Sequence, residues 1–182
     1  MLLSIALLVT EITLNVYKNQ KDKDKEVTSN QKTQKTSTVD DQNDKNPWSF
    51  YSNTDYSISF SYPYLLHKVE YEDSGEYKFF IVFEENQFSV EKGVAFGVSK
   101  DGLEKEVAGI KEEISKQGKS KIIKDEQSDF GGNKSWILEF EKEEESLENR
   151  SFLIIQKGDY TYSFSTVPGQ MQKLSESIQF LD

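Results

Sequence analysis

His67 is the single histidine of the 182-residue chain, and the chain contains no cysteine. A protein metal site needs several good ligands, which one imidazole without a second histidine or a thiolate does not supply. The lack of cysteine also excludes a disulfide framework, a thiolate nucleophile and lipid attachment to a cysteine. We interpret His67 as an ordinary surface or edge residue and predict no metal site.

Carboxylates are the other side chains that could do chemistry, and they occur in two dense runs. The first run could attract Ca²⁺, but it lacks the alternating Asp or Asn ligands and the glycine that shape a calcium loop, and Lys142 interrupts it. The second run, Glu70, Glu72 and Asp73, has the same character. Both runs are predicted to be solvated loops. The members of the first run are Glu141, Glu143, Glu144, Glu145 and Glu148.

The sequence carries no nucleophile elbow, no glycine-rich phosphate loop and no histidine relay. Any two of the 32 acidic residues could converge in the fold, so a hydrolase with an unrecognised carboxylate site stays open as an alternative. Our prediction is a chain that is not an enzyme, with no catalytic residue, no cofactor-binding residue and no cofactor. Partner-binding residues are not identifiable at this stage.

Two further motifs are weak signals. Asn133-Lys-Ser135 and Asn149-Arg-Ser151 match the glycosylation sequon, which chance also produces in a serine-rich chain. The aromatic residues are mostly interpreted as sheet residues, and any exposed cluster of them would be the best candidate for a partner surface. These aromatic residues include Tyr62, Tyr64, Tyr71, Trp136, Tyr160 and Tyr162.

The formal net charge is -10, which argues against nucleic-acid binding because such proteins present a basic surface to phosphates. Residues 18–47 carry seven lysines and six acids, and Glu11 is the only charged residue before them. These charges cancel, so the whole net charge lies in residues 48–182. The acidity therefore belongs to the part that is expected to fold.

Residues 1–17 are rich in Leu, Ile and Val and are predicted to be a hydrophobic N-terminal anchor, or an uncleaved signal that acts as one. As a transmembrane helix they would reach about 25 Å, slightly less than the roughly 30 Å of a hydrocarbon core. No basic residue precedes them, which an upstream start codon would explain. The alternative is an amphipathic first helix of the folded domain.

Residues 18–47 contain Lys, Asp, Asn, Gln, Ser and Thr, with only Val27 and Val39 as aliphatic residues. Such a segment cannot bury enough apolar surface to offset its loss of conformational entropy. We predict a disordered polar linker with an end-to-end distance of about 30 Å.

Residues 48–182 are predicted to form an α+β domain, an antiparallel sheet covered by helices. Residues 56–62 alternate large apolar side chains with serine, the period of a half-buried strand, and Pro63 ends them. In residues 93–98 large and small residues alternate, which indicates close packing over the small side. The remaining strands are predicted at residues 68–71, 77–83, 121–125, 136–141, 152–156 and 160–165, most of them joined by hairpin-length turns.

Two helices are predicted. Asp101 is placed as an N-cap and Gly118 near the C-cap of a helix whose apolar residues recur at helical spacing, and Glu112 and Lys116 form an i,i+4 pair on its exposed side. A second amphipathic helix follows Pro168-Gly169 and extends to Leu181. The apolar set of the first helix is Leu103, Val107, Ile110 and Ile114, and that of the second is Met171, Leu174, Ile178 and Leu181.

The opening strand that ends in Pro63, the helix after Asp101-Gly102, the turn Phe130-Gly-Gly-Asn-Lys-Ser-Trp136 and the C-terminal Ser177-Ile-Gln-Phe-Leu181 together resemble the PsbP-like domain of photosystem-associated and bacterial cell-envelope proteins. The resemblance covers about residues 48–182. It implies an α/β/α sandwich around an antiparallel sheet and a non-enzymatic role in binding or assembling a partner on the outer side of a membrane. It carries over no metal or partner-binding residue.

The sequence as a whole favours a membrane-anchored, extracytoplasmic binding or assembly module, held to the membrane through residues 1–17. Its partner is expected to be another protein of the cell envelope, and tethering would raise that partner's effective concentration. A soluble intracellular adaptor of the same fold is the alternative, and it would require residues 1–17 to pack against the domain.

Overall fold

The computed structural model describes residues 48–71, 77–84, 93–116, 120–142 and 149–181. The predicted anchor at 1–17 and linker at 18–47 lie outside these residues, and so do the turn at 73–75 and Gly118. Neither helix in the described part is long and apolar enough to cross a membrane. The helices are α2 (Leu103–Lys116) and α3 (Pro168–Ser177), and the strands are β1 (Trp48–Asn53), β2 (Ile58–Pro63), β3 (His67–Tyr71), β4 (Tyr77–Glu84), β5 (Val94–Ser99), β6 (Ser120–Phe130), β7 (Asn133–Lys142), β8 (Arg150–Lys157), β9 (Tyr160–Thr166) and β10 (Gln179–Phe180).

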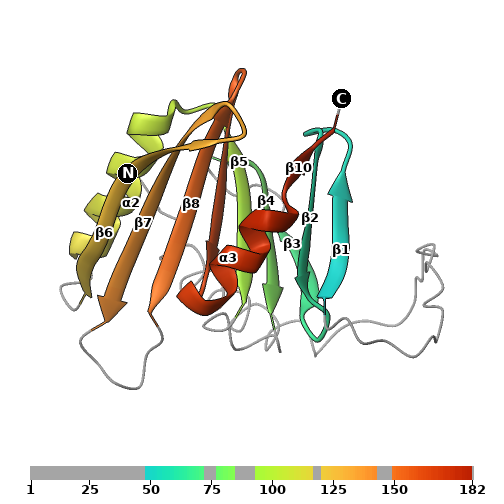
Figure 1. Ribbon diagram of the computed structural model, residues 1–182, viewed down its shortest axis with the longest axis horizontal. Helices are drawn as coiled ribbons and strands as arrows, with labels where there is room; N and C mark the ends of the chain where they lie inside the picture. Colours follow the sequence, from blue (N-terminus) through green and yellow to red (C-terminus); the bar gives the residue numbers. More distant parts are fainter. Residues whose placement is uncertain (1–47, 72–76, 85–92, 117–119, 143–148, 182) are drawn as a thin grey trace, which may run out of the picture.

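Seven strands form the larger sheet, in the order β3-β4-β5-β9-β8-β7-β6, and every neighbouring pair is antiparallel (Figure 1). The strands β4, β5, β8 and β9 are buried along most of their length. A sheet whose middle strands are apolar on both faces needs a covering layer on each side.

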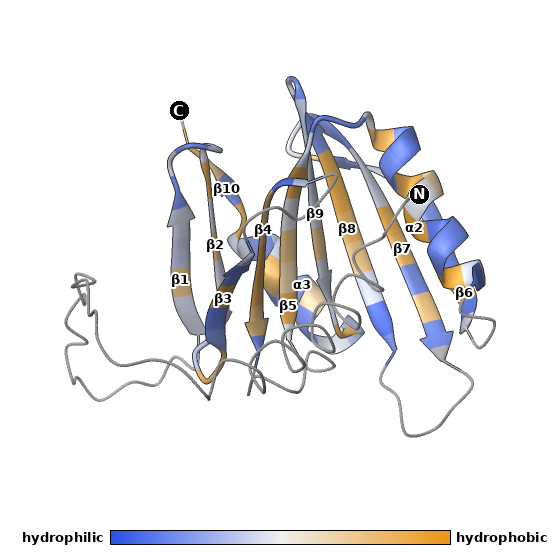
Figure 2. Cartoon of the chain, turned by 180° about the vertical axis from the view of Figure 1, so that it is seen from behind, coloured by the Kyte–Doolittle hydropathy of each residue, from blue (hydrophilic) through white to orange (hydrophobic). Residues whose placement is uncertain are grey.

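Helix α2 covers one face of the larger sheet. The four apolar residues that predicted this helix, Leu103, Val107, Ile110 and Ile114, are all buried against it. Figure 2 shows its hydrophobic side against the strands and its hydrophilic side outward. At about 1.5–3 kcal/mol for each buried aliphatic side chain, this stripe holds the helix in place. On its exposed side the predicted Glu112–Lys116 pair forms, with Nζ and Oε1 2.8 Å apart.

The other face is covered by α3 and by a second, three-stranded sheet of order β1-β2-β10 (Figure 1). Phe60 of β2 lies at the centre of the contact, with its ring centroid 5.2 Å from those of Phe96 and Phe164 and 5.7 Å from that of Phe83. Edge-to-face aromatic pairs at these distances add to the burial of their area. The contact between the two layers forms one of the two hydrophobic cores seen among the described residues.

The second sheet is a correction to the single sheet that the sequence predicted. No strand was predicted at residues 48–53, where β1 pairs along its whole length with β2. The predicted strand at 56–62 starts later, at Ile58, because Ser57 has a positive φ of 48° and its carbonyl accepts a hydrogen bond from the Leu181 amide. The predicted stop at Pro63 is confirmed.

The C-terminal helix is shorter than predicted. It ends at Ser177, whose hydroxyl accepts a hydrogen bond from the Ser61 amide, and Ile178 takes an extended conformation. Gln179 and Phe180 then pair with β2 as β10, so pairing with the sheet ends a helical pattern that continues in the sequence. Strand β6 is longer than predicted, since it pairs with β7 from Ser120 to Phe130. The other strands and α2 agree with the predicted order.

Gly97 in β5 explains the alternation of large and small residues there. A Cβ at this position would lie 2.7 Å from the Tyr77 ring and 3.3 Å from the Phe80 ring. The sequence predicted close packing over the small side of this strand, and the Tyr77 ring provides it.

Gly97→Ala should destabilise the domain, by about 1–3 kcal/mol, because the buried Tyr77 ring must shift to admit a methyl group. Chemical denaturation followed by tryptophan fluorescence measures the free energy of unfolding. The control is Gly109→Ala in α2, where the added Cβ meets nothing within 4 Å and should stabilise the helix by up to about 1 kcal/mol. A Gly97→Ala chain as stable as the parent would contradict this packing.

Candidate functional site

A buried polar cluster surrounds Glu106, an acid in the first turn of α2 that is 8% exposed. Its Oε1 accepts hydrogen bonds from the Tyr77 hydroxyl at 2.6 Å and the Ser163 hydroxyl at 2.8 Å, and its Oε2 accepts one from the Ser99 hydroxyl at 3.2 Å. These donors come from β4, β9 and β5. The carboxylate therefore joins the helix to three neighbouring strands, which is a structural role, and its oxygens are taken up by protein donors.

A second polar cluster joins α2 to the outer strands β6 and β7. Asp125 accepts a 2.7 Å hydrogen bond from the Trp136 indole and pairs with Lys111 at 2.6 Å, and the Lys111 ammonium lies 4.9 Å from the centre of the Trp136 ring. The hydrogen bonds from Lys111 and Trp136 lower the pKa of Asp125. The cluster lies at the surface, since the Lys111 and Asp125 side chains are 30% and 41% exposed.

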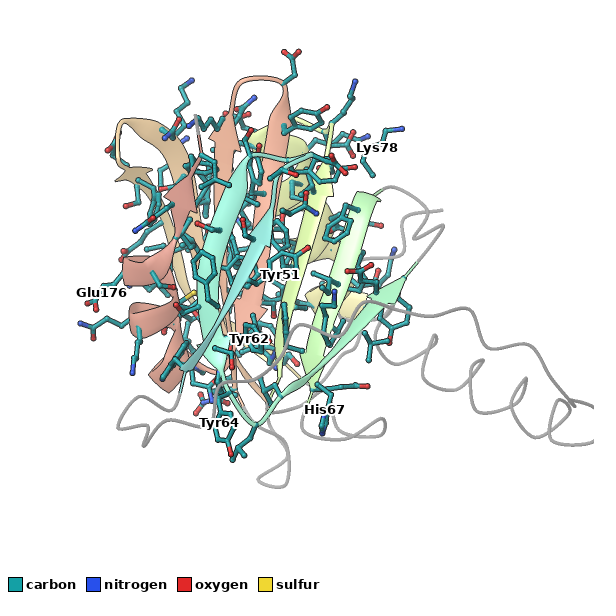
Figure 3. All side chains as sticks on the ribbon, turned by 90° about the vertical axis from the view of Figure 1, so that its right-hand side faces the viewer. Tyr51, Tyr62, Tyr64, His67, Lys78 and Glu176 are labelled. Carbon is teal, nitrogen blue, oxygen red and sulfur yellow. The ribbon has the colours of Figure 1, made fainter. Side chains whose placement is uncertain are left out.

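His67 is the first residue of β3, is exposed, and lies opposite Glu84 in the β3–β4 ladder. Figure 3 shows it at the outer side of the domain, pointing away from the core. Burial raises the pKa of Glu84, and the charge of a protonated His67 opposes that rise. Within the described ranges no three histidine or acidic side chains come together as a metal site.

The structure separates the other residues that the sequence singled out. Glu70 is exposed and pairs with Lys68 at 2.8 Å, and Glu141 is exposed in β7. The sequon Asn133 is half-buried at the start of β7, where its side-chain amide donates to the Phe130 carbonyl, and Asn149 is half-buried just before β8. The remaining acids of the two runs, Glu72, Asp73, Glu143, Glu144, Glu145 and Glu148, lie outside the described residues.

Most of the aromatic residues are sheet residues, as predicted. Tyr162 is buried in the core, and Tyr62 packs on Phe83 with ring centroids 4.0 Å apart. Tyr64 differs from them, because it is 61% exposed at the turn between β2 and β3 (Figure 3). Its neighbour Leu65 is 64% exposed.

The exposed apolar residues of the described part concentrate near this turn. Trp48, the first residue of β1, lies opposite Pro63, the last residue of β2, and Phe50 lies opposite Ser61 and is 65% exposed. We call Trp48, Phe50, Pro63, Tyr64 and Leu65 the apolar end. Sequence reasoning named Tyr64 but missed Phe50 and Leu65, although apolar residues at a turn are themselves a signal, since turns favour Gly, Asn, Asp and Ser.

The four edges of the two sheets differ in how they are protected against pairing with another strand. Strand β3 has the Lys68–Glu70 ion pair, β6 carries five charged side chains and a register shift at Ile122–Lys124, and β10 has only two residues. Charges, bulges and short length all discourage strand addition. Strand β1, with the sequence WSFYSN, has none of these features, and no strand of the described part pairs with its outer side.

No family model matches the sequence, and no curated protein matches it. Among solved structures, cyanobacterial PsbP (CyanoP) from Synechocystis sp. PCC 6803 has a TM-score of 0.54 and 14% identity, over 79% of this chain and 98% of that chain. PA94 from Pseudomonas aeruginosa, a protein of unknown function, has a TM-score of 0.32 and 10% identity, over 70% of this chain and 88% of that chain. The first likeness shows that the domain has a PsbP-like α+β fold, as the resemblance implied.

Glu106→Ala should destabilise the domain by about 3 kcal/mol, because three buried hydroxyl groups lose their acceptor. Urea denaturation gives the free energy of unfolding. Glu104→Ala, an exposed acid in the same helical turn, is the matched control and should cost less than about 1 kcal/mol. Equal losses in the two variants would show that the hydroxyl bonds to Glu106 add nothing to stability.

Glu84→Gln should stabilise the domain relative to the parent more at pH 8 than at pH 4. The pKa of Glu84 is higher in the folded chain than in the unfolded chain, where it is about 4.3. The contribution of Glu84 to stability is therefore present at pH values below the unfolded-chain pKa, and it is lost as the pH rises through the folded-chain pKa. Glutamine never ionises and avoids that loss. Denaturation of both chains at the two pH values measures the difference, and the same difference at both would contradict the assignment.

Proposed function

We propose that this chain is a membrane-tethered, extracytoplasmic, non-catalytic binding module whose strand β1 pairs with an extended segment of another cell-envelope protein. The observation that supports the binding part is the β1 edge, which is six residues long, uncharged and without a described partner on its outer side. An added strand would gain main-chain hydrogen bonds along this edge.

The side chains of β1 would give such pairing its specificity. Phe50 is exposed and faces the same side of the small sheet as Ser61, whereas Tyr51 is buried and holds the strand on the core through Phe60 and Phe83. A partner strand could place an apolar side chain next to Phe50 and hydroxyl or amide groups next to Ser52. The acidic charge of residues 48–182 favours a partner that is neutral or basic around its binding strand.

The tethering part rests on sequence composition. The apolar residues 1–17 are expected to enter a membrane, and the polar residues 18–47 are expected to link them to Trp48. A linker of about 30 Å would keep the module close to the membrane surface, where it raises the effective concentration of a membrane-bound partner.

The buried acid Glu106 does not have the accessibility that a catalytic group needs. A general acid or base must reach a substrate proton, whereas both oxygens of Glu106 are bonded to hydroxyl groups of the core. We therefore assign Glu106 to stability and keep the prediction that the chain is not an enzyme.

The β1 edge can be tested with a photo-crosslinking amino acid at position 50 in the full-length, C-terminally tagged chain, produced in its native cells. We expect a discrete adduct with one protein, and we expect protease added to intact cells to remove it. The matched control is the same amino acid at Ile123, a 51% exposed residue of β6 on the far edge of the larger sheet.

Equal adducts from positions 50 and 123 would mean random collisions and would contradict binding at β1. A specific adduct that protease cannot reach would keep the β1 interface but favour the intracellular adaptor. Phe50→Lys should weaken native capture of the same partner about tenfold or more, since a charge on the strand opposes pairing.

A further inference from the structure

We propose that the turn between β2 and β3 lies in the lipid–water interface of the membrane to which the domain is tethered, with Tyr64 and Leu65 as the inserted side chains. This inference rests on the tether of the proposed function. It adds a second, reversible membrane contact that the folded domain itself makes.

The turn has an unusual composition for its geometry. The Leu66 amide donates a 3.0 Å hydrogen bond to the Pro63 carbonyl, so Tyr64 and Leu65 occupy the two central positions of a β-turn. Central turn positions favour small polar residues, but these two large side chains are 61% and 64% exposed. Leu66, by contrast, is buried in the core, so the turn is fixed to the domain.

The position of the turn brings it toward the tether. Trp48 lies opposite Pro63, so the chain enters the domain at the same end at which Tyr64 and Leu65 project. The described part has four exposed large hydrophobic residues; Phe50, Tyr64 and Leu65 belong to the apolar end, and Ile123 lies on the far edge. Phe50 is two residues from Trp48, about 7 Å along the strand.

The chemistry of the turn itself suits a lipid–water interface better than a strand partner. A turn tip has no edge along which a strand could pair, and Pro63 has no amide hydrogen to leave unbonded. Tyrosine and tryptophan favour the level of the lipid headgroups, where their apolar rings and polar groups are both satisfied.

A lysine lies beside one of these aromatic rings. The Lys173 ammonium is 4.7 Å from the centre of the Trp48 ring, and His67 is exposed just after the turn. A lysine at this level can extend its ammonium to lipid phosphates while its stem lies along apolar surface. The net charge of the folded part opposes attraction to an anionic surface, so apolar insertion has to supply the contact.

The test uses the full-length chain in phosphatidylcholine vesicles, with a single tryptophan as a depth probe. The sequence has two tryptophans, and Trp48→Phe with Trp136→Phe removes both. Leu65→Trp in this background places the probe on the turn. Ile123→Trp places it at the control position, where an exposed aliphatic residue is replaced on the far edge of the larger sheet. Vesicle flotation measures membrane association, and lipids brominated on the upper acyl chain quench only a probe that enters the interface.

We expect both chains to float with the vesicles, and we expect brominated lipid to reduce the emission of the probe at position 65 about twofold or more while leaving that at position 123 nearly unchanged. Tyr64→Ser with Phe50→Ser should restore most of the emission at position 65 without preventing flotation. Circular dichroism checks that each variant is folded.

Each of the other outcomes contradicts a specific part of the proposal, either the inserted turn or the tether. Flotation without quenching at position 65 overturns the inserted turn and leaves the tether in place, which is the result expected if the apolar end instead binds a protein. Equal quenching at positions 65 and 123 also overturns it, because the domain then lies on the membrane without a preferred side. Loss of flotation overturns the tether and the inserted turn together.

Discussion

The larger sheet is apolar on both faces in its middle, and the rest of the domain is arranged to satisfy that constraint. Ile81 and Phe83 of β4 face one core, while Phe80 and Val82 of the same strand face the other. Leaving either face exposed to water would cost about 25 cal/mol of free energy for each Å² of apolar surface. One face receives α2, and the other receives α3 with the small sheet, which gives the layers seen in Figure 1.

The close contact at Gly97 and the polar bonds of Glu106 belong to one arrangement. The Tyr77 ring lies over Gly97, and its hydroxyl continues to the Glu106 carboxylate in α2. A side chain on β5 would move the ring, and a moved ring would lose the bond to the helix. The space above the backbone of one strand thus helps to set the position of the helix in the adjacent layer.

Sequence periodicity predicted the elements whose pattern is set by burial against one surface. The spacing of Leu103, Val107, Ile110 and Ile114 predicted α2, and alternation predicted the strands that the structure shows as β2 and β5. It failed where pairing between distant segments decides the structure. Residues 48–53 have apolar side chains on both sides and no clear period, and residues 178–181 continue a helical pattern until β2 pairs with them as β10.

The candidate surface was predictable only in part, for a similar reason. Tyr64 was singled out with five other aromatic residues, but composition does not tell an exposed apolar side chain from a buried one, and those five lie wholly or partly in the core. Glu106 went unnoticed because its three hydroxyl donors come from separate strands. The fold is needed to bring such groups together.

Strand β2 pairs with β1 on one side and with β10 on the other, and the hydrogen bond from Ser61 to Ser177 joins residues 116 positions apart. Contacts of such sequence separation form slowly, because the chain between them must first lose loop entropy. The small sheet is thus expected to close late during folding. Until it closes, Phe83 and Phe96 have no cover, and a chain stalled at that stage would expose an aromatic sheet face prone to aggregation.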